Sequence, residues 1–154
     1  MTFTVLHWYY IFDRHGRWEI LKESLIYCTN NKALSIHSYV FMLNHMHLIA
    51  KCPDMAGFTR DFKKHTAQEL MRNMQKTEPM MADLFRTGDG HYRIWQRGNL
   101  PILLESESVL YKKAEYIERN PVKKGYVERP EYWRYSSANP NSPVFCKNRR
   151  DSDF

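Results

Sequence analysis

Two histidines separated by one residue are the first feature of this sequence that could carry out chemistry. His45 and His47 lie in the apolar stretch 44–49, which is typical of a β-strand. Because residues two apart on a strand point to the same side, both imidazoles share one face while Met46 and Leu48 pack on the other. Two imidazoles at this spacing can bind one divalent cation. The spacing also fits two half-buried histidines without a ligand, and a closed zinc site would need two more ligands, which no nearby cysteine supplies.

The second candidate is a helix-like segment that stops near Pro121. Tyr116 and Asn120 are four residues apart, so they lie one turn apart on one helix face. Lys112 lies one turn before Tyr116, and Lys113 is nearly on the same stripe. A phenol is a poor nucleophile at neutral pH, and a neighbouring ammonium group could stabilise its ionised form. The alternative is an ordinary amphipathic helix with a tyrosine at the core edge, and Pro121 disfavours helical geometry at Asn120.

Basic residues form a third cluster in the helical segment 58–66. Arg60, Lys63 and Lys64 could face phosphates, or could form a solvated helix face. The whole chain of 154 residues carries 23 Lys and Arg against 17 Asp and Glu, a net charge of +6. Such a balance favours a polyanionic partner, either nucleic acid or an anionic membrane surface. The aromatic share of 14% fits a surface that stacks unpaired bases.

Several classes of protein are excluded by composition. The chain has no run of about 18 apolar residues, so it predicts no membrane-spanning helix. The first ten residues lack the basic region and cleavage site of a secretory signal. Three cysteines without CxxC spacing argue against a disulfide framework and favour reduced thiols. We therefore expect a cytoplasmic protein without a membrane partner.

The elements that must position these residues follow from hydrophobic spacing. β-branched, aromatic and alternating segments predict strands over 2–8, 34–42, 45–51 and 91–96, and helical stripes predict helices over 18–28, 58–74 and 107–119. Ser106 is the expected N-cap of the last helix. The order β-α-β-β-α-β-α predicts an α+β fold, a ferredoxin-like antiparallel sheet with helices packed on it. We expect one domain over residues 1–138 and a flexible tail over 139–154, which is rich in Asn, Pro and Ser.

The motifs in combination resemble the HUH single-tyrosine transposases, and in particular the REP-associated tyrosine transposases of the insertion-sequence 200-like type. The resemblance covers nearly the whole chain. The matching pieces follow in the family's order: the first strand 2–5, the histidine motif 39–49, the "FK-x-x-T" helix 62–66, the "WQ" strand 94–99, the "YI-x-x-NPV" helix 116–122, and the segments 125–127 and 135–137. Lys124 departs from the pattern, since the family usually has a small residue there.

The resemblance implies a site and a reaction. His45, His47 and Asn120 would bind a divalent metal, Mg²⁺ or Mn²⁺, and Tyr116 would be the nucleophile. The implied activity is cleavage and rejoining of single-stranded DNA through a 5′-phosphotyrosine. The substrate would be a hairpin or palindromic repeat. The active protein would be a monomer or a homodimer.

Further residues would contact the DNA. On this interpretation Lys112 or Lys113 would hold the phenolate or the phosphate, and the helices carrying the basic residues would flank the metal site. The remaining contacts are expected from the basic helix and the "WQ" strand: Arg60, Lys63, Lys64, Trp95 and Arg97. Three alternatives stay open at this point. One is a domesticated protein that holds hairpin DNA without cutting it, and another is a basic domain without a DNA role. The third is a replication initiator or relaxase with the same H-x-H chemistry, which the small size disfavours.

Overall fold

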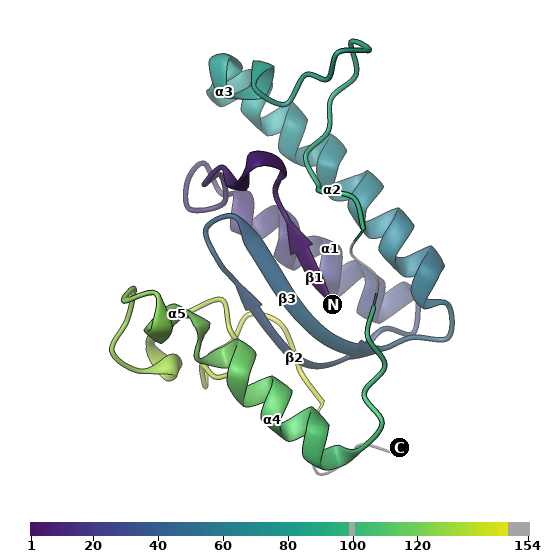
Figure 1. Cartoon of the computed structure of the whole chain (residues 1–154), viewed down its shortest axis with the longest axis vertical. Helices are drawn as coiled ribbons and strands as arrows, with labels where there is room; N and C mark the ends of the chain where they lie inside the picture. The colour runs from purple at the N-terminus through teal and green to yellow at the C-terminus, as the bar shows by residue number, and fades with distance from the viewer. Residues whose placement is uncertain (99–100, 148–154) are drawn as a thin grey trace.

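A computed structural model of the chain describes residues 1–98 and 101–147 (Figure 1). Its centre is an antiparallel sheet of three strands in the order β1-β3-β2, namely β1 (Thr2–Thr4), β2 (Ser35–Phe41) and β3 (His45–Lys51). β2 and β3 form the predicted hairpin, and β1 pairs with the outer edge of β3 through Thr2↔His47 and Thr4↔His45. The sequence places these strands correctly. The first strand is shorter than expected, because the chain turns into a 3-10 helix, η1 (Leu6–Trp8).

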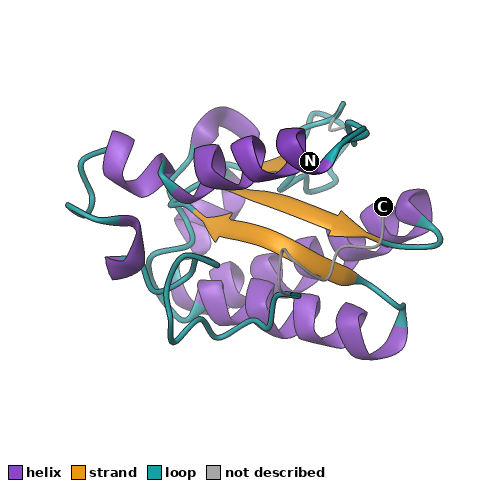
Figure 2. Ribbon diagram, turned by 90° about the horizontal axis from the view of Figure 1, so that it is seen from below, coloured by secondary structure: helices purple, strands orange, loops and turns teal. Residues whose placement is uncertain are grey.

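Helices cover both faces of the sheet (Figure 2). The helices of the structure are α1 (Arg17–Asn31), α2 (Met55–Thr77), α3 (Pro79–Asp83), α4 (Glu107–Glu118), α5 (Asn120–Lys123) and the 3-10 helix η2 (Pro130–Tyr132). Side chains cap the starts of α2 and α4. Asp54 accepts from the Gly57 N–H at 2.8 Å, and Ser106, the predicted cap, accepts from the Val109 N–H at 3.4 Å. Within the described residues no helix is long and apolar enough to cross a membrane.

The two faces of the sheet pack against different helices. Met46 and Leu48 point into the large core, where they join side chains of α1 and α2 such as Leu21 and Phe62. The opposite face meets α4 through a small cluster built by Val40, Met42 and Ile117. This division follows the period of two along each strand, and it leaves the odd-numbered residues of β3 on the α4 side.

The predicted strand over 91–96 is wrong as a full element. In its place the chain makes single bridges, and residues 94–96 run beside β1 through Leu6 N–H to Ile94 O at 2.7 Å and Gln96 N–H to Thr4 O at 2.9 Å. Residues 135–137 cover the other edge of the sheet, beside β2, in the same way. These bonds occupy part of each edge of the sheet, which limits pairing with another chain there.

The packed chain extends beyond residue 138. Val144 is 2% exposed and belongs to the large core. The Tyr39 hydroxyl hydrogen bonds to Ser142 Oγ at 2.7 Å, and the Lys147 N–H donates to Ile36 O at 2.8 Å. Residues 139–147 therefore pack on β2 where the sequence suggested a frayed tail, and residues 148–154 lie outside the described part of the chain.

Arg17, at the start of α1, is fully buried and ties three segments together. Its guanidinium donates to Asn73 Oδ1 at 2.8 Å, to Ile11 O at 3.1 Å and to Thr77 Oγ1 at 3.1 Å. It also forms an ion pair with Glu78. A buried guanidinium is tolerated only when its donors are satisfied, and here α2 supplies most of the acceptors.

We expect Arg17→Ala to lower the free energy of unfolding by about 3–5 kcal/mol, because it strands buried acceptors and leaves a cavity. Arg14→Ala is the matched control. Its side chain is 40% exposed, and its ion pair with Glu78 should contribute about 1 kcal/mol or less. Urea unfolding followed by circular dichroism measures both. Equal losses in the two variants would contradict this assignment.

Candidate active site

His45 and His47 lie side by side on the face of β3 that α4 covers. Their ring centroids are 4.9 Å apart and their planes are inclined at 83°. Across the sheet His47 pairs with Thr2 on β1 and with Val40 on β2. The prediction that both imidazoles share one face is confirmed.

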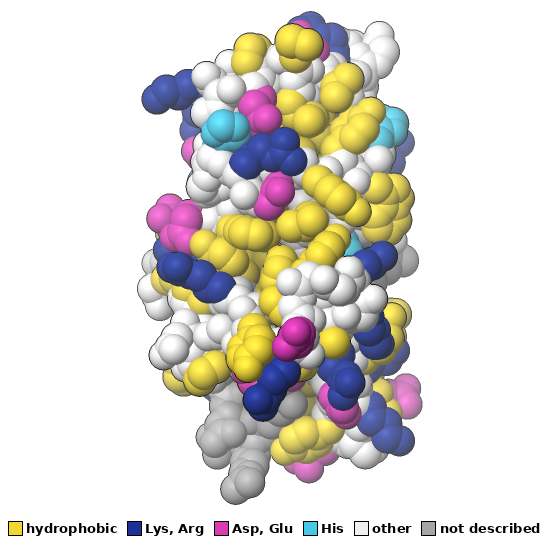
Figure 3. Space-filling view, turned by 90° about the vertical axis from the view of Figure 1, so that its left-hand side faces the viewer, with side chains coloured by type: hydrophobic (Ala, Val, Ile, Leu, Met, Phe, Trp, Pro, Cys, Tyr) yellow, Lys and Arg dark blue, Asp and Glu magenta, His cyan; other side chains and the backbone are white. Residues whose placement is uncertain are grey.

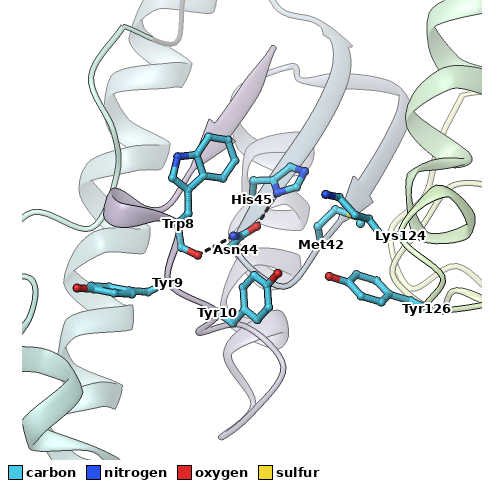
Figure 4. Close-up of a pocket in the computed structure, with 8 residues that line it drawn as sticks. All are labelled: Trp8, Tyr9, Tyr10, Met42, Asn44, His45, Lys124 and Tyr126. Carbon is cyan, nitrogen blue, oxygen red and sulfur yellow. Dashed lines mark hydrogen bonds between the residues drawn. The ribbon is translucent and has the colours of Figure 1, made fainter.

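Both rings are oriented by hydrogen bonds at Nδ1. Thr2 Oγ1 lies 2.8 Å from His47 Nδ1, and Asn44 Oδ1 lies 2.7 Å from His45 Nδ1. The Asn44 amide is itself fixed, since its Nδ2 donates to the Trp8 carbonyl at 2.7 Å (Figure 4). Oδ1 therefore accepts, His45 Nδ1 carries the proton, and the His45 Nε2 lone pair is left for a ligand. Such outer partners fix the tautomer of a metal-binding histidine.

Burial keeps both imidazoles neutral. It lowers the pKa of His45 to about 4, and the Lys124 ammonium adds to the effect. It also lowers the pKa of His47 to about 4, with His45 and the N-terminal ammonium adding to it. At pH 7 both imidazoles are therefore neutral, which is the form that binds a metal ion.

Asn120 opens the short helix α5 and carries an unusual amide. Its Nδ2 is fully buried and has no hydrogen-bond partner among the described residues. Half a rotation of the amide would present Oδ1 at that position, and an amide oxygen is a ligand that Mg²⁺ and Mn²⁺ accept. One turn later the Lys124 N–H donates to Asn120 O at 3.0 Å, and the Lys124 side chain shares a cavity with His45.

The donor set fits an open two-histidine site better than a closed zinc site. In the described ranges no group of three or more His, Cys, Asp or Glu side chains is placed to hold a metal ion. Two imidazoles supply fewer than the four protein ligands that structural zinc sites use, so a cation held by this pair would keep coordination positions open.

Tyr116 lies on the exposed side of α4, with 53% of its surface accessible. Two lysines approach its ring: Lys123 Nζ is 3.8 Å and Lys113 Nζ is 6.0 Å from the centroid. The helix does not run through Asn120 as one piece, since α4 ends at Glu118 and α5 starts after Arg119. The expected end of the helix near Pro121 is confirmed for α4, but the expectation of a non-helical Asn120 is wrong, because Asn120 and Pro121 form the first turn of α5, where proline is well tolerated.

A buried carboxylate anchors the end of α4 to the sheet. Glu118 Oε1 accepts from Ser137 Oγ at 2.6 Å and from Ser38 Oγ at 3.1 Å, and Ser38 is fully buried on β2. Ile117 packs beside it on Val40. These contacts fix the helix that carries Tyr116 on the histidine face of the sheet.

The structure shows that the predicted DNA contact Trp95 is a core residue, and that the ammonium group of Lys63 is bonded within the protein. Trp95 is 5% exposed, packs against Phe3 and donates from Nε1 to Thr66 Oγ1 at 3.0 Å, so it is a core residue and has no face for a base. Lys63 is half-buried. Its Nζ donates to Gln96 O at 2.9 Å, and burial lowers its pKa.

The remaining predicted contacts lie on two sides of the sheet. All of the exposed ones are basic: Arg60 and Lys64 on α2, Arg97 after the segment that runs beside β1, and Lys112 and Lys113 on α4. Because α2 packs on the face opposite the histidines, its basic residues do not flank them. Asn99, the last residue of the "WQ" motif, lies outside the described residues.

Sequence analysis missed five residues that the structure brings to the site. Thr2 and Asn44 orient the histidines, Lys123 lies on Tyr116, and Trp8 and Lys124 line the cavity beside His45. Strand register alone could have indicated Thr2. The others depend on how η1 and α5 pack.

Comparisons with known proteins agree with the fold. No protein-family model and no curated protein matches the chain. A solved structure of a REP-associated tyrosine transposase bound to a REP hairpin is similar, with a TM-score of 0.67 and 19% identity. The match covers 99% of this chain and 86% of that one. The predicted α+β fold, that of the tyrosine transposases, is confirmed.

We expect Thr2→Val to weaken Mn²⁺ binding about 10–100-fold, because it frees the His47 ring while keeping the shape of the side chain. Titration calorimetry with Mn²⁺ alone measures this without any reaction. Thr29→Val, which removes a hydroxyl bonded within α1, is the control and should bind as the parent does. Unchanged affinity in Thr2→Val would show that Thr2 does not orient a ligand.

Proposed function

We propose that this protein is a metal-dependent endonuclease and strand transferase for single-stranded DNA. On this proposal it acts at hairpin or palindromic repeat sites through a 5′-phosphotyrosine. One observation carries the proposal: two neutral, oriented imidazoles lie on the sheet face to which the Tyr116 helix is anchored. The fold supports it, since a protein of the same fold was solved with a REP hairpin.

His45, His47 and Asn120 would hold the cation, Mg²⁺ or Mn²⁺. When bound, the cation would neutralise charge on the non-bridging oxygens of the scissile phosphate. Thr2 and Asn44 keep the imidazoles in the binding orientation, and the open positions leave room for the phosphate. The buried, orphaned amide of Asn120 gives this donor set its third member.

Tyr116 would attack the phosphorus in line. Its phenol loses a proton to solvent, the Tyr116 Oη–P bond forms, and the P–O3′ bond breaks, so O3′ leaves and takes up a proton. Attack of a 3′-hydroxyl on the phosphotyrosine reverses these steps and joins strands without an external energy source. Lys123 and Lys113, which lie on the Tyr116 ring, stabilise the negative charge that develops on the phenolate.

The DNA would be held by exposed basic side chains, because phosphate contacts dominate affinity for nucleic acid. Of the predicted contacts, those with accessible side chains stay in the proposal: Arg60, Lys64, Arg97, Lys112 and Lys113. The net charge of +6 fits this partner.

We expect Tyr116→Phe to abolish the covalent adduct with a labelled hairpin carrying single-stranded flanks in the presence of Mg²⁺ or Mn²⁺. DNA affinity should stay within about twofold, because the substitution removes one exposed hydroxyl. Denaturing gel electrophoresis detects the adduct. Tyr111→Phe is the matched control on the same helix, since Tyr111 is also exposed. An adduct in Tyr116→Phe would assign the nucleophile elsewhere, and tight binding without any cleavage by the parent would favour a hairpin-binding protein.

We expect Lys123→Ala to slow adduct formation about tenfold, because it removes the nearer cation on the Tyr116 ring. Lys76→Ala removes an exposed lysine at the end of α2 and should leave the rate unchanged. Single-turnover kinetics with saturating DNA separate this effect from weaker binding. An unchanged rate in Lys123→Ala would remove Lys123 from the mechanism.

A further inference from the structure

A cavity of about 480 Å³ opens beside His45, between η1 and α5. Eight residues line it: Trp8, Tyr9, Tyr10, Met42, Asn44, His45, Lys124 and Tyr126 (Figure 4). Four of these described residues are Trp or Tyr, one is a lysine and none is acidic. Its volume is in the range of small-molecule sites. Figure 3 shows apolar side chains gathered across the middle of the face that carries α5 and the N-terminal segment.

Trp8 is presented at this cavity by an unusual backbone. His7 and Trp8 both have positive φ, 57° and 60°, which is uncommon for residues with a bulky side chain. The strain is held by two hydrogen bonds, Trp8 N–H to Val5 O at 3.1 Å and Asn44 Nδ2 to Trp8 O. The result is an indole that is 58% exposed, edge-on to the His45 ring at 6.1 Å. Strain of this kind persists where the surrounding structure maintains it, and it occurs at functional sites.

Lys124 supplies the charge at the other side of the cavity. Its side chain extends toward His45, and its charge is felt there, since it contributes to the lowered pKa of that histidine (Figure 4). Below it the hydroxyl groups of Tyr10 and Tyr126 face each other. The cavity thus combines an exposed aromatic face, hydroxyl groups and one cation, which suits a planar, polar ring attached to an anion.

We propose that this cavity holds one unpaired nucleotide of the DNA strand, with its base on the Trp8 indole and a phosphate on the Lys124 ammonium. The inference rests on the proposed function, because it places that nucleotide next to the scissile phosphate at His45. The same chemistry would also suit a free nucleotide. The strand is the better occupant because His45 itself lines the cavity. Asn44, which also lines it, bonds both Trp8 and His45.

The test measures binding, with the Tyr116→Phe protein so that the strand stays intact. Fluorescence anisotropy gives the affinity for a labelled hairpin with single-stranded flanks, in which each flanking nucleotide in turn is made abasic. We expect one abasic position to weaken binding about 5–150-fold, the range that loss of one stacked base gives. Adding Trp8→Ala should weaken binding of the intact strand by a similar factor and remove the penalty at that position. Trp8→Phe keeps a ring and should restore most of the affinity.

Lys124 is tested in the same background. Lys124→Ala should make the slope of log affinity against log salt less steep by about 0.7, the share of one phosphate contact on a single strand. Lys124→Arg should preserve the slope. The controls are Tyr132→Ala and Lys76→Ala, which remove an exposed ring and an exposed cation away from the cavity and should change nothing. Circular dichroism melts check that every variant is folded.

The outcomes separate this inference from the proposed function. If no abasic position weakens binding, the subsite is overturned, even if the parent protein cuts DNA. The same holds if the abasic position still weakens binding in the Trp8→Ala variant. A deoxynucleoside monophosphate that competes as well as the strand shows a site for free nucleotides and also overturns it. If Trp8→Ala weakens binding of the intact strand and removes the abasic penalty, but the parent forms no covalent adduct, the subsite is supported and the proposed cleavage is rejected. No binding of the strand rejects both.

Discussion

The alternation of side chains along β3 is the constraint on which the rest of the structure depends. Met46 and Leu48 must enter the large core, which fixes His45 and His47 on the opposite face. A slip by one residue would bury two imidazoles among aromatic rings and expose the apolar pair. The packing of α1 and α2 therefore holds the histidines in register as firmly as any contact they make themselves.

The α4 face of the sheet can carry polar groups because its apolar cluster is small. Val40, Met42 and Ile117 cover only one part of that face, and Glu118 with its two serine partners secures the helix end without further apolar area. The rest of the face is left to the histidine pair and to the cavity beside it. A buried carboxylate that binds two hydroxyl groups also sets the position of α4 along β2 more specifically than apolar contact alone.

The parts of the site that depend on local periodicity could be predicted from the sequence. The shared face of His45 and His47, the hairpin before them and the cap at Ser106 all follow from spacing over a few residues. The fold class follows from the order of elements. Trp95 could not be placed, because an aromatic residue near an edge strand fits a stacking surface and a core equally well, and only its packing on Phe3 decides. Contacts of Thr2 and Lys123 likewise depend on how distant segments meet.

Lys124 bears most directly on how metal and DNA would share this site. An ammonium group beside His45 disfavours a second positive charge nearby, since two like charges a few ångströms apart repel even through an effective dielectric of about 20. The same ammonium attracts phosphate. On the proposed function, a DNA phosphate near Lys124 and a cation held by the histidines would reduce the repulsion between these two positive charges. Asn44 links the histidine to the Trp8 side of the cavity, because its one amide both orients the His45 ring and bonds the strained backbone at Trp8.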